Sequence, residues 1–251
     1  MTKIFTIIFY QPILNLLVLF YNTLSFHDLG VAIILLTAAI KLILWPLGRS
    51  SIKSQKALQD LQPKIEELKT KYAGDKVGLS QATMELYKEN KVNPFSSCLP
   101  LLLQLPFLFA VYRVFLNGVG NKLDLVYSFI NRPETINTIS LGFLDLAKPN
   151  VYLAILAGLA QFWQAKMMLT AKPAIKSAGS QDENMAAIMN KQMLYIMPAV
   201  TVFIGISLPG GLTLYWFVLT LFTALQQVVT FHKKNGSENS AVKVVEGEII
   251  K

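Results

Sequence analysis

The charged residue Lys41 lies inside an apolar stretch, residues 29–48, that is long enough to cross a bilayer. It follows the start of that stretch by about 12 residues, or about 18 Å along a helix. A charge at this depth is costly unless it reaches water, protein or a counter-charge. Thr37 lies one helical turn earlier on the same face. The sequence predicts either a cation awaiting an external anion or a side chain that snorkels to the headgroups.

Further polar side chains interrupt the other long apolar segments. They are Gln104 in 98–118, Gln161 and Gln164 in 150–169, and Tyr215, Trp216, Thr220 and Thr223 in 212–231. Isolated in lipid, each would be expensive to bury. They favour a shared hydrated cavity, although hydrogen bonds between helices, worth about 0.6 kcal/mol each, are an alternative. No acidic residue occurs in these segments, so none is available there to pair with Lys41.

The elements that must position these residues are predicted to be membrane-spanning helices. The chain of 251 residues is 53% hydrophobic and only 15% charged, which excludes a soluble globular enzyme. Five segments are long and apolar enough to be spans, at about 29–48, 98–118, 150–169, 193–208 and 212–231. The turn residues Pro209, Gly210 and Gly211 predict a tight hairpin between the last two.

The sequence offers no familiar catalytic or metal chemistry. It has one cysteine, Cys98, and two histidines, so no metal site can be assembled from them. It contains no phosphate-binding GxxxxGK[ST] loop, no HExxH and no GxSxG. We therefore expect neither an enzyme nor a cofactor, and no catalytic residue or specific nucleic-acid binding.

The distribution of positive charge predicts the orientation of the spans. Residues 49–91 hold nine Lys or Arg residues, whereas 119–149 hold three. The positive-inside rule then places 49–91, 166–192 and the C-terminus in the cytoplasm, with the N-terminus outside. The expected location is a bacterial cytoplasmic (inner) membrane, crossed several times.

The N-terminal residues 1–28 are predicted to form an interfacial amphipathic helix. Gln11, Asn15 and Asn22 share one face of an otherwise apolar helix that Pro12 interrupts. A sixth span over residues 4–26 is the alternative.

Two amphipathic helices are predicted over residues 50–92. One has an apolar seam, and a turn at Gly74 separates it from the second; the seam residues are Leu58, Leu61, Ile65, Leu68 and Tyr72. This cytoplasmic helical hairpin is either a scaffold for the spans or a contact surface for incoming chains or ribosomes. Residues 233–251 are expected to be a short flexible tail, which leaves 29–232 as the core.

Several stretches resemble the YidC family of membrane protein insertases. They are IKLILWPL at 40–47, LQPKI at 61–65, LYKENKVNP at 86–94, CLPLLLQLP at 98–106 and PGGLTLYW at 209–216. The resemblance covers roughly residues 10–232. It implies a bacterial member that lacks the large external domain and the lipoprotein cysteine. The usual arginine of the family is lysine here, at position 41.

The resemblance implies a five-helix core with a hydrophilic groove open to the cytoplasm and the lipid. Thr37, Lys41, Gln104, Trp163, Tyr215 and Trp216 map to this groove, to which Gln161, Gln164 and Thr220 are added from the polar set above. The face along which substrates slide maps to Leu101, Leu105 and Phe109 and to Ile196, Val200 and Phe203.

The implied function is insertion and folding of nascent membrane proteins without nucleotide hydrolysis. Nascent membrane proteins and the lipid bilayer are the expected partners, with the ribosome and the Sec translocon as further candidates. An assembly chaperone that moves nothing across the membrane is one alternative. A small-solute transporter is the other, although no intramembrane carboxylate or inverted repeat supports it.

Overall fold

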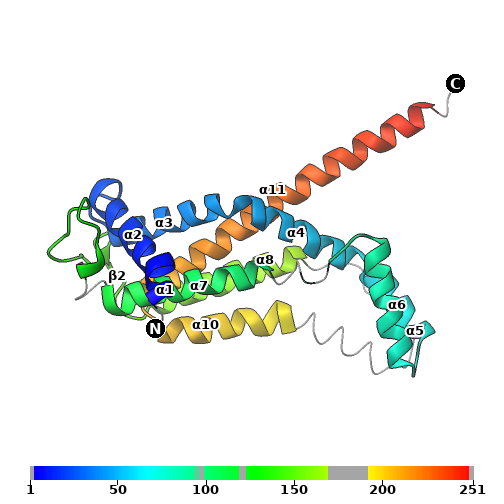
Figure 1. Cartoon of the computed structure of the whole chain (residues 1–251), viewed down its shortest axis with the longest axis horizontal. Coiled ribbons are helices and arrows are strands. Elements are labelled where there is room, and N and C mark those ends of the chain that lie inside the picture. Colours follow the sequence, from blue (N-terminus) through cyan, green and yellow to red (C-terminus); the bar gives the residue numbers. More distant parts are fainter. Residues whose placement is uncertain (1–2, 94, 96–98, 119–122, 169–191, 249–251) are drawn as a thin grey trace.

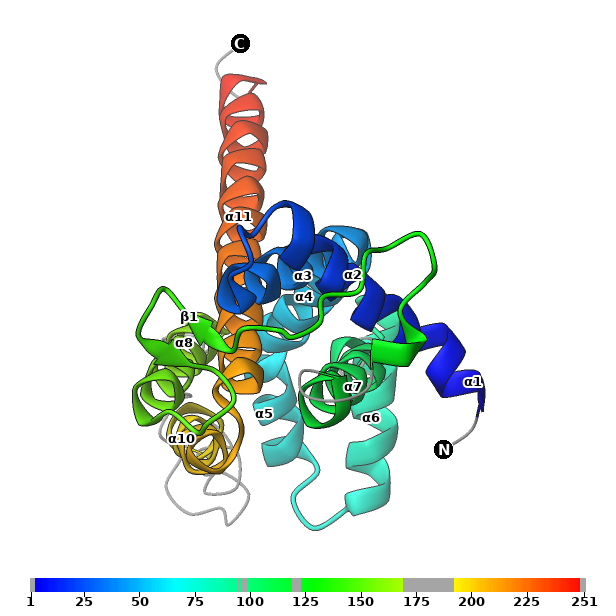
Figure 2. The ribbon, with the colours of Figure 1, turned by 90° about the vertical axis from the view of Figure 1, so that its left-hand side faces the viewer.

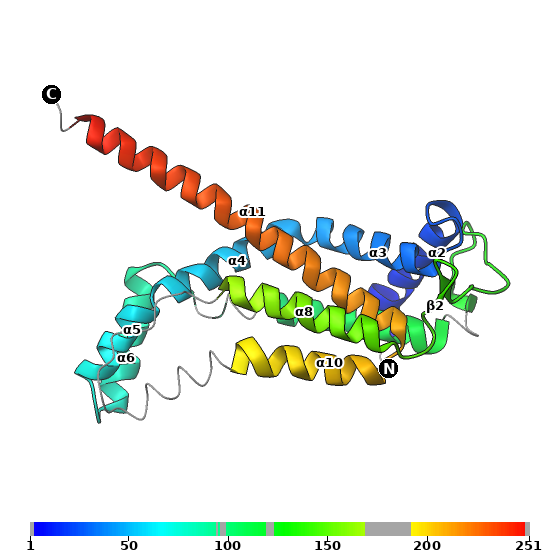
Figure 3. The same cartoon turned by 180° about the vertical axis from the view of Figure 1, so that it is seen from behind.

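The computed structural model is an elongated bundle of helices with a small cap at one end (Figure 1). It describes residues 3–93, 95, 99–118, 123–168 and 192–248. The long helices run side by side, the cap lies at one end of them, and a helical hairpin lies at the other. The view from behind shows the same arrangement (Figure 3). The expected all-helical membrane fold class is confirmed, and the described residues contain only one short two-stranded sheet.

Continuous helix forms the N-terminal region. It comprises α1 (Lys3–Phe5), the π-helical turn η1 (Thr6–Tyr10) and α2 (Gln11–Thr23), where Pro12 occupies the first turn of α2. Proline has no N–H to donate to the preceding turn, and that turn is the π-helical η1, whose hydrogen-bond pattern already departs from the α-helix. The whole segment Lys3–Thr23 is long and apolar enough to cross a membrane. Both the interfacial helix and the sixth span therefore stay predictions.

The first predicted span is bent. Helix α3 (Leu29–Ile43) begins at the N-cap Asp28, and the chain then turns by 70° into α4 (Trp45–Asp60). The span predicted over about 29–48 therefore contains all of α3 and the first residues of α4, with a bend after Ile43. The physical reason is Pro46, which cannot donate a helical hydrogen bond and favours the first turn of a new helix.

The expected hairpin at residues 50–92 is present. It consists of the outer part of α4, then α5 (Gln62–Lys71) and α6 (Lys76–Glu89), which pack together. Gly74 has a positive φ of 91° in the turn between them, a conformation that glycine adopts without strain. From the predicted seam, Leu61 and Ile65 are buried.

The cap follows α7 (Leu99–Arg113) and η3 (Val114–Gly118). We define the cap as residues 123–150 together with the α2–α3 turn, residues 24–28. It contains η4 (Leu123–Leu125), and an antiparallel pair of strands, β1 (Ile139–Ser140) and β2 (Leu144–Asp145). Figure 2 views the bundle from this end.

The last two helices are joined by the expected tight turn, and each of them packs along α8. After α8 (Val151–Met168) come η5 (Gln192–Ile196), α10 (Met197–Ser207) and α11 (Gly210–Glu248), with a tight turn at Leu208–Pro209. Helix α11 packs against α3, α4 and α8, so it is the central helix of the bundle. It continues past residue 231 into the expected tail, where the sequence has no further proline to end it.

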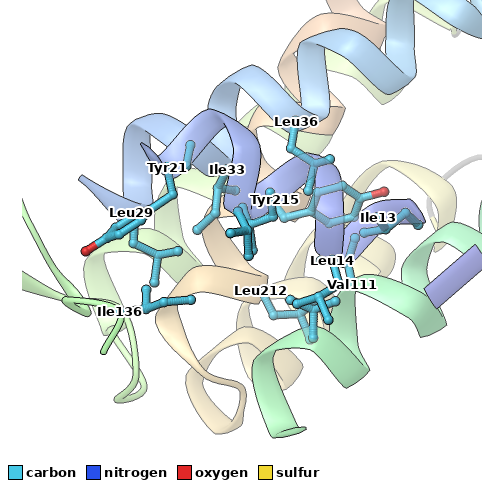
Figure 4. Packing of buried hydrophobic residues seen from close by; sticks show 14 of the residues in the cluster. Ile13, Leu14, Tyr21, Leu29, Ile33, Leu36, Val111, Ile136, Leu212 and Tyr215 are labelled. Carbon is cyan, nitrogen blue, oxygen red and sulfur yellow. The ribbon is translucent and has the colours of Figure 1, made fainter. Parts of the chain in front are cut away.

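A hydrophobic core fills the cap half of the bundle. Its buried residues come from α2, α3, α7, α11 and the cap, and Figure 4 labels ten of them, including Leu14, Leu29, Val111, Ile136 and Tyr215. Segments far apart in the sequence meet here, which ties the N-terminal helices to the last one.

Two helices of the described residues are long and apolar enough to span a membrane, Lys3–Thr23 and Gly210–Phe231. The bent pair α3–α4 brings the number to 3 if it is one span, and the apolar helices Gln104–Leu116 and Gln192–Ser207 are shorter. The five predicted spans each contain a helix, but the five-span core itself stays a prediction.

Candidate functional site

Lys41 lies in the last turn of α3 and points to the central helix α11. Its side chain is half-buried, and its Nζ donates a hydrogen bond of 2.6 Å to Oγ1 of Thr223. The Thr223 hydroxyl donates in turn to the Leu219 carbonyl. The three ion pairs found in the described part of the chain involve other residues. The ammonium therefore has a neutral partner and spare donors.

The second polar contact joins α7 to α11. The Gln104 amide donates to the Tyr215 hydroxyl at 2.5 Å, and the Tyr215 side chain is fully buried. Gln104 itself is half-buried. This pair connects the half of the bundle that contains α7 with the central helix.

The third polar contact joins α8 to α10. The Thr201 hydroxyl donates to Oε1 of Gln161, and Thr201 is buried. Gly158 lets the helices approach, because a Cβ there would lie 2.4 Å from Val202. We call these six residues the polar centre: Lys41, Thr223, Gln104, Tyr215, Gln161 and Thr201.

The other predicted groove residues occupy varied environments. Thr37 is buried and donates to the Ile33 carbonyl of its own helix, so it gives Lys41 no partner. Thr220 is buried, whereas Gln164 and Trp216 are half-buried and Trp163 is exposed. The structure thus places Lys41, Gln104, Gln161 and Tyr215 in contacts between helices, but not the rest.

A polar stripe along α11 extends beyond the two threonines, Thr220 and Thr223, that were predicted from the sequence. Thr220, Thr223, Gln227 and Thr230 follow one another at spacings of three, four and three residues, which is one helical face. Gln227 is buried, and its Oε1 has no hydrogen-bond partner among the described residues. The spacing itself is the signal that would have found this stripe.

Gln226 was also missed, and it contacts the bend between α3 and α4. Its amide donates to the Trp45 carbonyl at 3.0 Å. Its side chain also covers Gly48, where an added Cβ would lie 3.0 Å from the amide. Helix α11 thereby holds the first turn of α4.

Apolar side chains are exposed on α7 and on η5–α10. From the predicted slide, Leu105 and Phe109 are exposed on α7; Ile196, Val200 and Phe203 are exposed on η5–α10. The side chain of Leu101 lies outside the described residues. Helix α10 packs along α8, while α7 packs against α2, α4 and η1, so the two apolar faces belong to helices with separate packing partners.

The polar face predicted on the N-terminal helix binds the cap. The Asn15 side chain donates to the Leu125 carbonyl at 3.1 Å and accepts from the Tyr127 N–H at 2.7 Å. Gln11 and Asn22 donate to the carbonyls of Leu125 and Asn131. These three polar residues are therefore used by protein contacts.

Asp28 connects the two parts of the cap. Its carboxylate accepts from the Val31 N–H, the Ser140 hydroxyl and the Leu141 N–H, the last at 2.7 Å. Partial burial acts to raise the pKa of Asp28, but these hydrogen bonds outweigh it and hold the pKa below its ordinary value. Asp28 is therefore both the N-cap of α3 and the anchor of the β1–β2 turn.

Comparison with known proteins identifies the family. The family model described as "60Kd inner membrane protein" matches residues 19–238. The chain is 35% identical to "Membrane protein insertase YidC 2" of Listeria innocua, over 95% of this chain and 77% of that protein. It is 36% identical to "Membrane protein insertase YidC" of Fusobacterium nucleatum, over 82% of this chain and 87% of that protein.

A longer relative matches over the same region. The "Membrane protein insertase YidC" of Syntrophus aciditrophicus is 36% identical over 86% of this chain but only 35% of its own length. The agreement of the family model with these relatives covers the polar centre and both apolar faces, and it shows that the chain belongs to the YidC family of membrane protein insertases, the 60Kd inner membrane protein family.

Proposed function

We propose that this chain is a bacterial inner-membrane insertase that inserts nascent membrane proteins and assists their folding. The observation that carries the proposal is the half-buried ammonium of Lys41, which has only a hydroxyl partner and no carboxylate among the described residues. We place the hairpin end and the C-terminus in the cytoplasm, and the N-terminus outside, because of the positive-inside distribution of charge.

In the proposed mechanism, an incoming apolar segment lies against the exposed side chains of α7 and η5–α10. Its short polar flank enters a hydrated groove beside the polar centre, where an acidic flank is attracted to Lys41. The remaining predicted groove residues line the same space; they are Thr37, Trp163 and Trp216 from the family resemblance, and Gln164 and Thr220 from the polar residues of the spans. The apolar segment then partitions into lipid, which provides about 25 cal/mol per Å² of apolar surface buried.

The chain itself needs no nucleotide in this scheme, because partitioning drives the release. Nascent membrane proteins and lipid are the partners on which the mechanism depends. We propose the ribosome and the Sec translocon as additional partners that deliver clients, and the α5–α6 hairpin as the surface that meets them.

The test is insertion of a short client into vesicles that contain the purified chain. The client is prepared with an acidic flank and with a neutral flank of equal length. We expect Lys41→Glu to lower insertion of the acidic-flank client by about tenfold, equivalent to about 1.4 kcal/mol, since attraction becomes repulsion. Lys41→Arg keeps the charge and should retain activity.

The matched control is Lys166→Glu, a reversal of an exposed charge in the last turn of α8. It should leave both clients inserted normally. Equal insertion by wild type and Lys41→Glu would remove Lys41 from the mechanism. An equal loss of insertion for both clients would show that Lys41 stabilises the fold and does not attract the acidic flank.

An assembly chaperone without insertion is the second candidate, favoured by the exposed apolar faces of α7 and α10. Photocrosslinkers at Phe109 and Phe203 would contact the client in both cases. Only an insertase would also protect the client's flank inside the vesicle, and contact without protection would favour the chaperone.

A further inference from the structure

Three phenylalanines of the cap are exposed to the surroundings, whereas two of its serines are buried. Phe26 is 94% exposed, and Phe129 and Phe143 are each 79% exposed. In contrast, Ser25 and Ser140 are buried, with 1% and 3% of their surface accessible. A loop that faces water would bury its phenylalanines and expose its serines. The turns that carry these phenylalanines therefore resemble a surface that contacts a medium less polar than water.

The backbone has an unusual conformation at Phe26 and at Leu141, which is also exposed. Phe26 has a φ of 52° and Leu141 a φ of 53°, both in the left-handed region. Such a conformation costs roughly 1 kcal/mol or more for a residue with a side chain. The Asp28 carboxylate fixes the second turn through the Leu141 N–H and the Ser140 hydroxyl. The exposure is thus a consequence of specific hydrogen bonds that hold these turns in place.

Several polar groups of the cap have partners within the protein. Asp145 forms an ion pair with Lys148 at 3.1 Å and accepts the Ala147 N–H, and Asp124 lies 4.0 Å from Arg132. The Tyr21 hydroxyl, from α2, accepts the Asn137 N–H. Groups paired in this way lose little on approaching a medium poorer in water.

The position of the cap matches the edge of a bilayer. From Trp45 at the bend back to Leu29 is 16 residues, about 24 Å of helix, which is most of a hydrocarbon core of about 30 Å. Exposed apolar side chains of α8 reach the same end, where Val151 is 49% and Tyr152 79% exposed. The exposed side chains of the cap continue this lipid-facing surface into the headgroup layer, where aromatic residues are favoured.

We propose that the cap is a lipid anchor, which inserts Phe26, Phe129, Leu141 and Phe143 into the interface of the leaflet at that end. Its partner is the boundary between headgroups and acyl chains, and binding needs no nascent protein. The anchor fixes the depth of the cap end, and through α3 it fixes the depth of Lys41. The proposal depends on membrane residence and not on insertase activity.

The experiment uses the full chain in nanodiscs that hold one copy each. The native residues Trp45, Trp163 and Trp216 are replaced by Phe, and Phe143→Trp supplies a single fluorophore that conserves the apolar character. Emission is compared in lipids with brominated acyl chains, which quench by contact, and in the presence of aqueous acrylamide. Phe26→Trp repeats the measurement in the other turn.

The matched control is Ala73→Trp, at the exposed turn of the hairpin. We expect the cap fluorophores to lose emission in brominated lipid and to resist acrylamide, and the control to do the reverse. Quenching of the cap fluorophores by acrylamide alone would place the cap in water and overturn the proposal. Resistance to both quenchers would place it against protein and overturn it as well.

Discussion

The cap end and the polar centre are held together in different ways. In the cap, side chains bind backbone groups more than 100 residues away, as Asn15 does with Leu125 and Tyr127. In the polar centre, single bonds join one side chain to another, as between Lys41 and Thr223. Backbone atoms have fixed positions, whereas flexible side chains can exchange partners. The cap end is therefore suited to keeping one conformation, and the polar centre to rearranging when a client segment binds.

Packing shows the same contrast. At the cap, Gly210 donates to the Lys148 carbonyl, and a Cβ on Gly210 would lie 2.9 Å from that oxygen. A Cβ on Gly30 would lie 2.2 Å from the Ser140 hydroxyl. At the centre, Lys41 and Gln104 are half-buried. Substitutions in the cap should therefore act on stability, and those in the centre on insertion.

The largest effect is expected for Gly210→Val. The new side chain would collide with backbone of the cap, which cannot move aside, so we expect a loss of about 3 kcal/mol or more in the free energy of unfolding. Thermal unfolding in detergent measures it. Ser207→Ala, exposed at the end of α10, is the control and should change stability by less than about 0.5 kcal/mol. Unchanged thermal stability of Gly210→Val would show that the cap can move to accommodate the new side chain.

The next effect is expected for Asn15→Leu. The Tyr127 N–H and the Leu125 carbonyl would lose a partner in a part-buried site, at a cost of about 1–3 kcal/mol. Gln11→Leu removes one exposed bond to the same carbonyl and should cost less. Protease cleavage within residues 123–150 reports the loosening. Equal resistance of both variants would contradict the role given to Asn15.

Asp28 gives a smaller, pH-dependent effect. Asp28→Ala removes the N-cap of α3 and should cost about 1 kcal/mol at neutral pH. Because the pKa of Asp28 is lowered in the folded state, its contribution is present above the ordinary carboxyl value of about 3.9 and is lost as the pH falls through the folded value. The acid limb of the stability curve should therefore flatten in Asp28→Asn. If the acid limb of the stability curve were unchanged in Asp28→Asn, the loss of stability at low pH would have to come from other carboxylates.

The smallest effect on stability is expected in the polar centre. Thr201→Val and Tyr215→Phe each delete one hydroxyl contact, worth about 0.6 kcal/mol in a membrane protein. Insertion of an acidic-flank client should fall more than stability does, because the groove loses polar lining. If either variant destabilised the protein as much as Asn15→Leu, the distinction between the two regions would fail.

The sequence predicted the elements better than their ends. Apolar periodicity predicted the helices within residues 50–92, and the residues Pro209, Gly210 and Gly211 predicted the turn between the last two helices, because both signals depend on local propensity. The bend after Ile43 was missed because Pro46 was read as part of an apolar run, although proline favours the start of a new helix.

For the site, the sequence identified buried polar residues but not their partners. A lone lysine among aliphatic residues is visible without a structure, yet its contact with Thr223 depends on how α3 packs against α11. The face of Gln11, Asn15 and Asn22 was correctly grouped, but whether a polar face meets lipid headgroups or a distant loop is decided by tertiary packing. The contact between Gln226 and the Trp45 carbonyl also depends on this packing, so the sequence alone does not predict it.

The bend between α3 and α4 has a mechanical consequence. The arm formed by α4, α5 and α6 begins at the 70° bend from α3, and the Gln226 amide is one of the contacts that hold its base to α11. A force applied at the tip of the arm would act on this contact between Gln226 and Trp45, which lies only a few residues from Lys41. If the hairpin binds a partner, as proposed above, the bend connects that binding surface to the helix that carries Lys41.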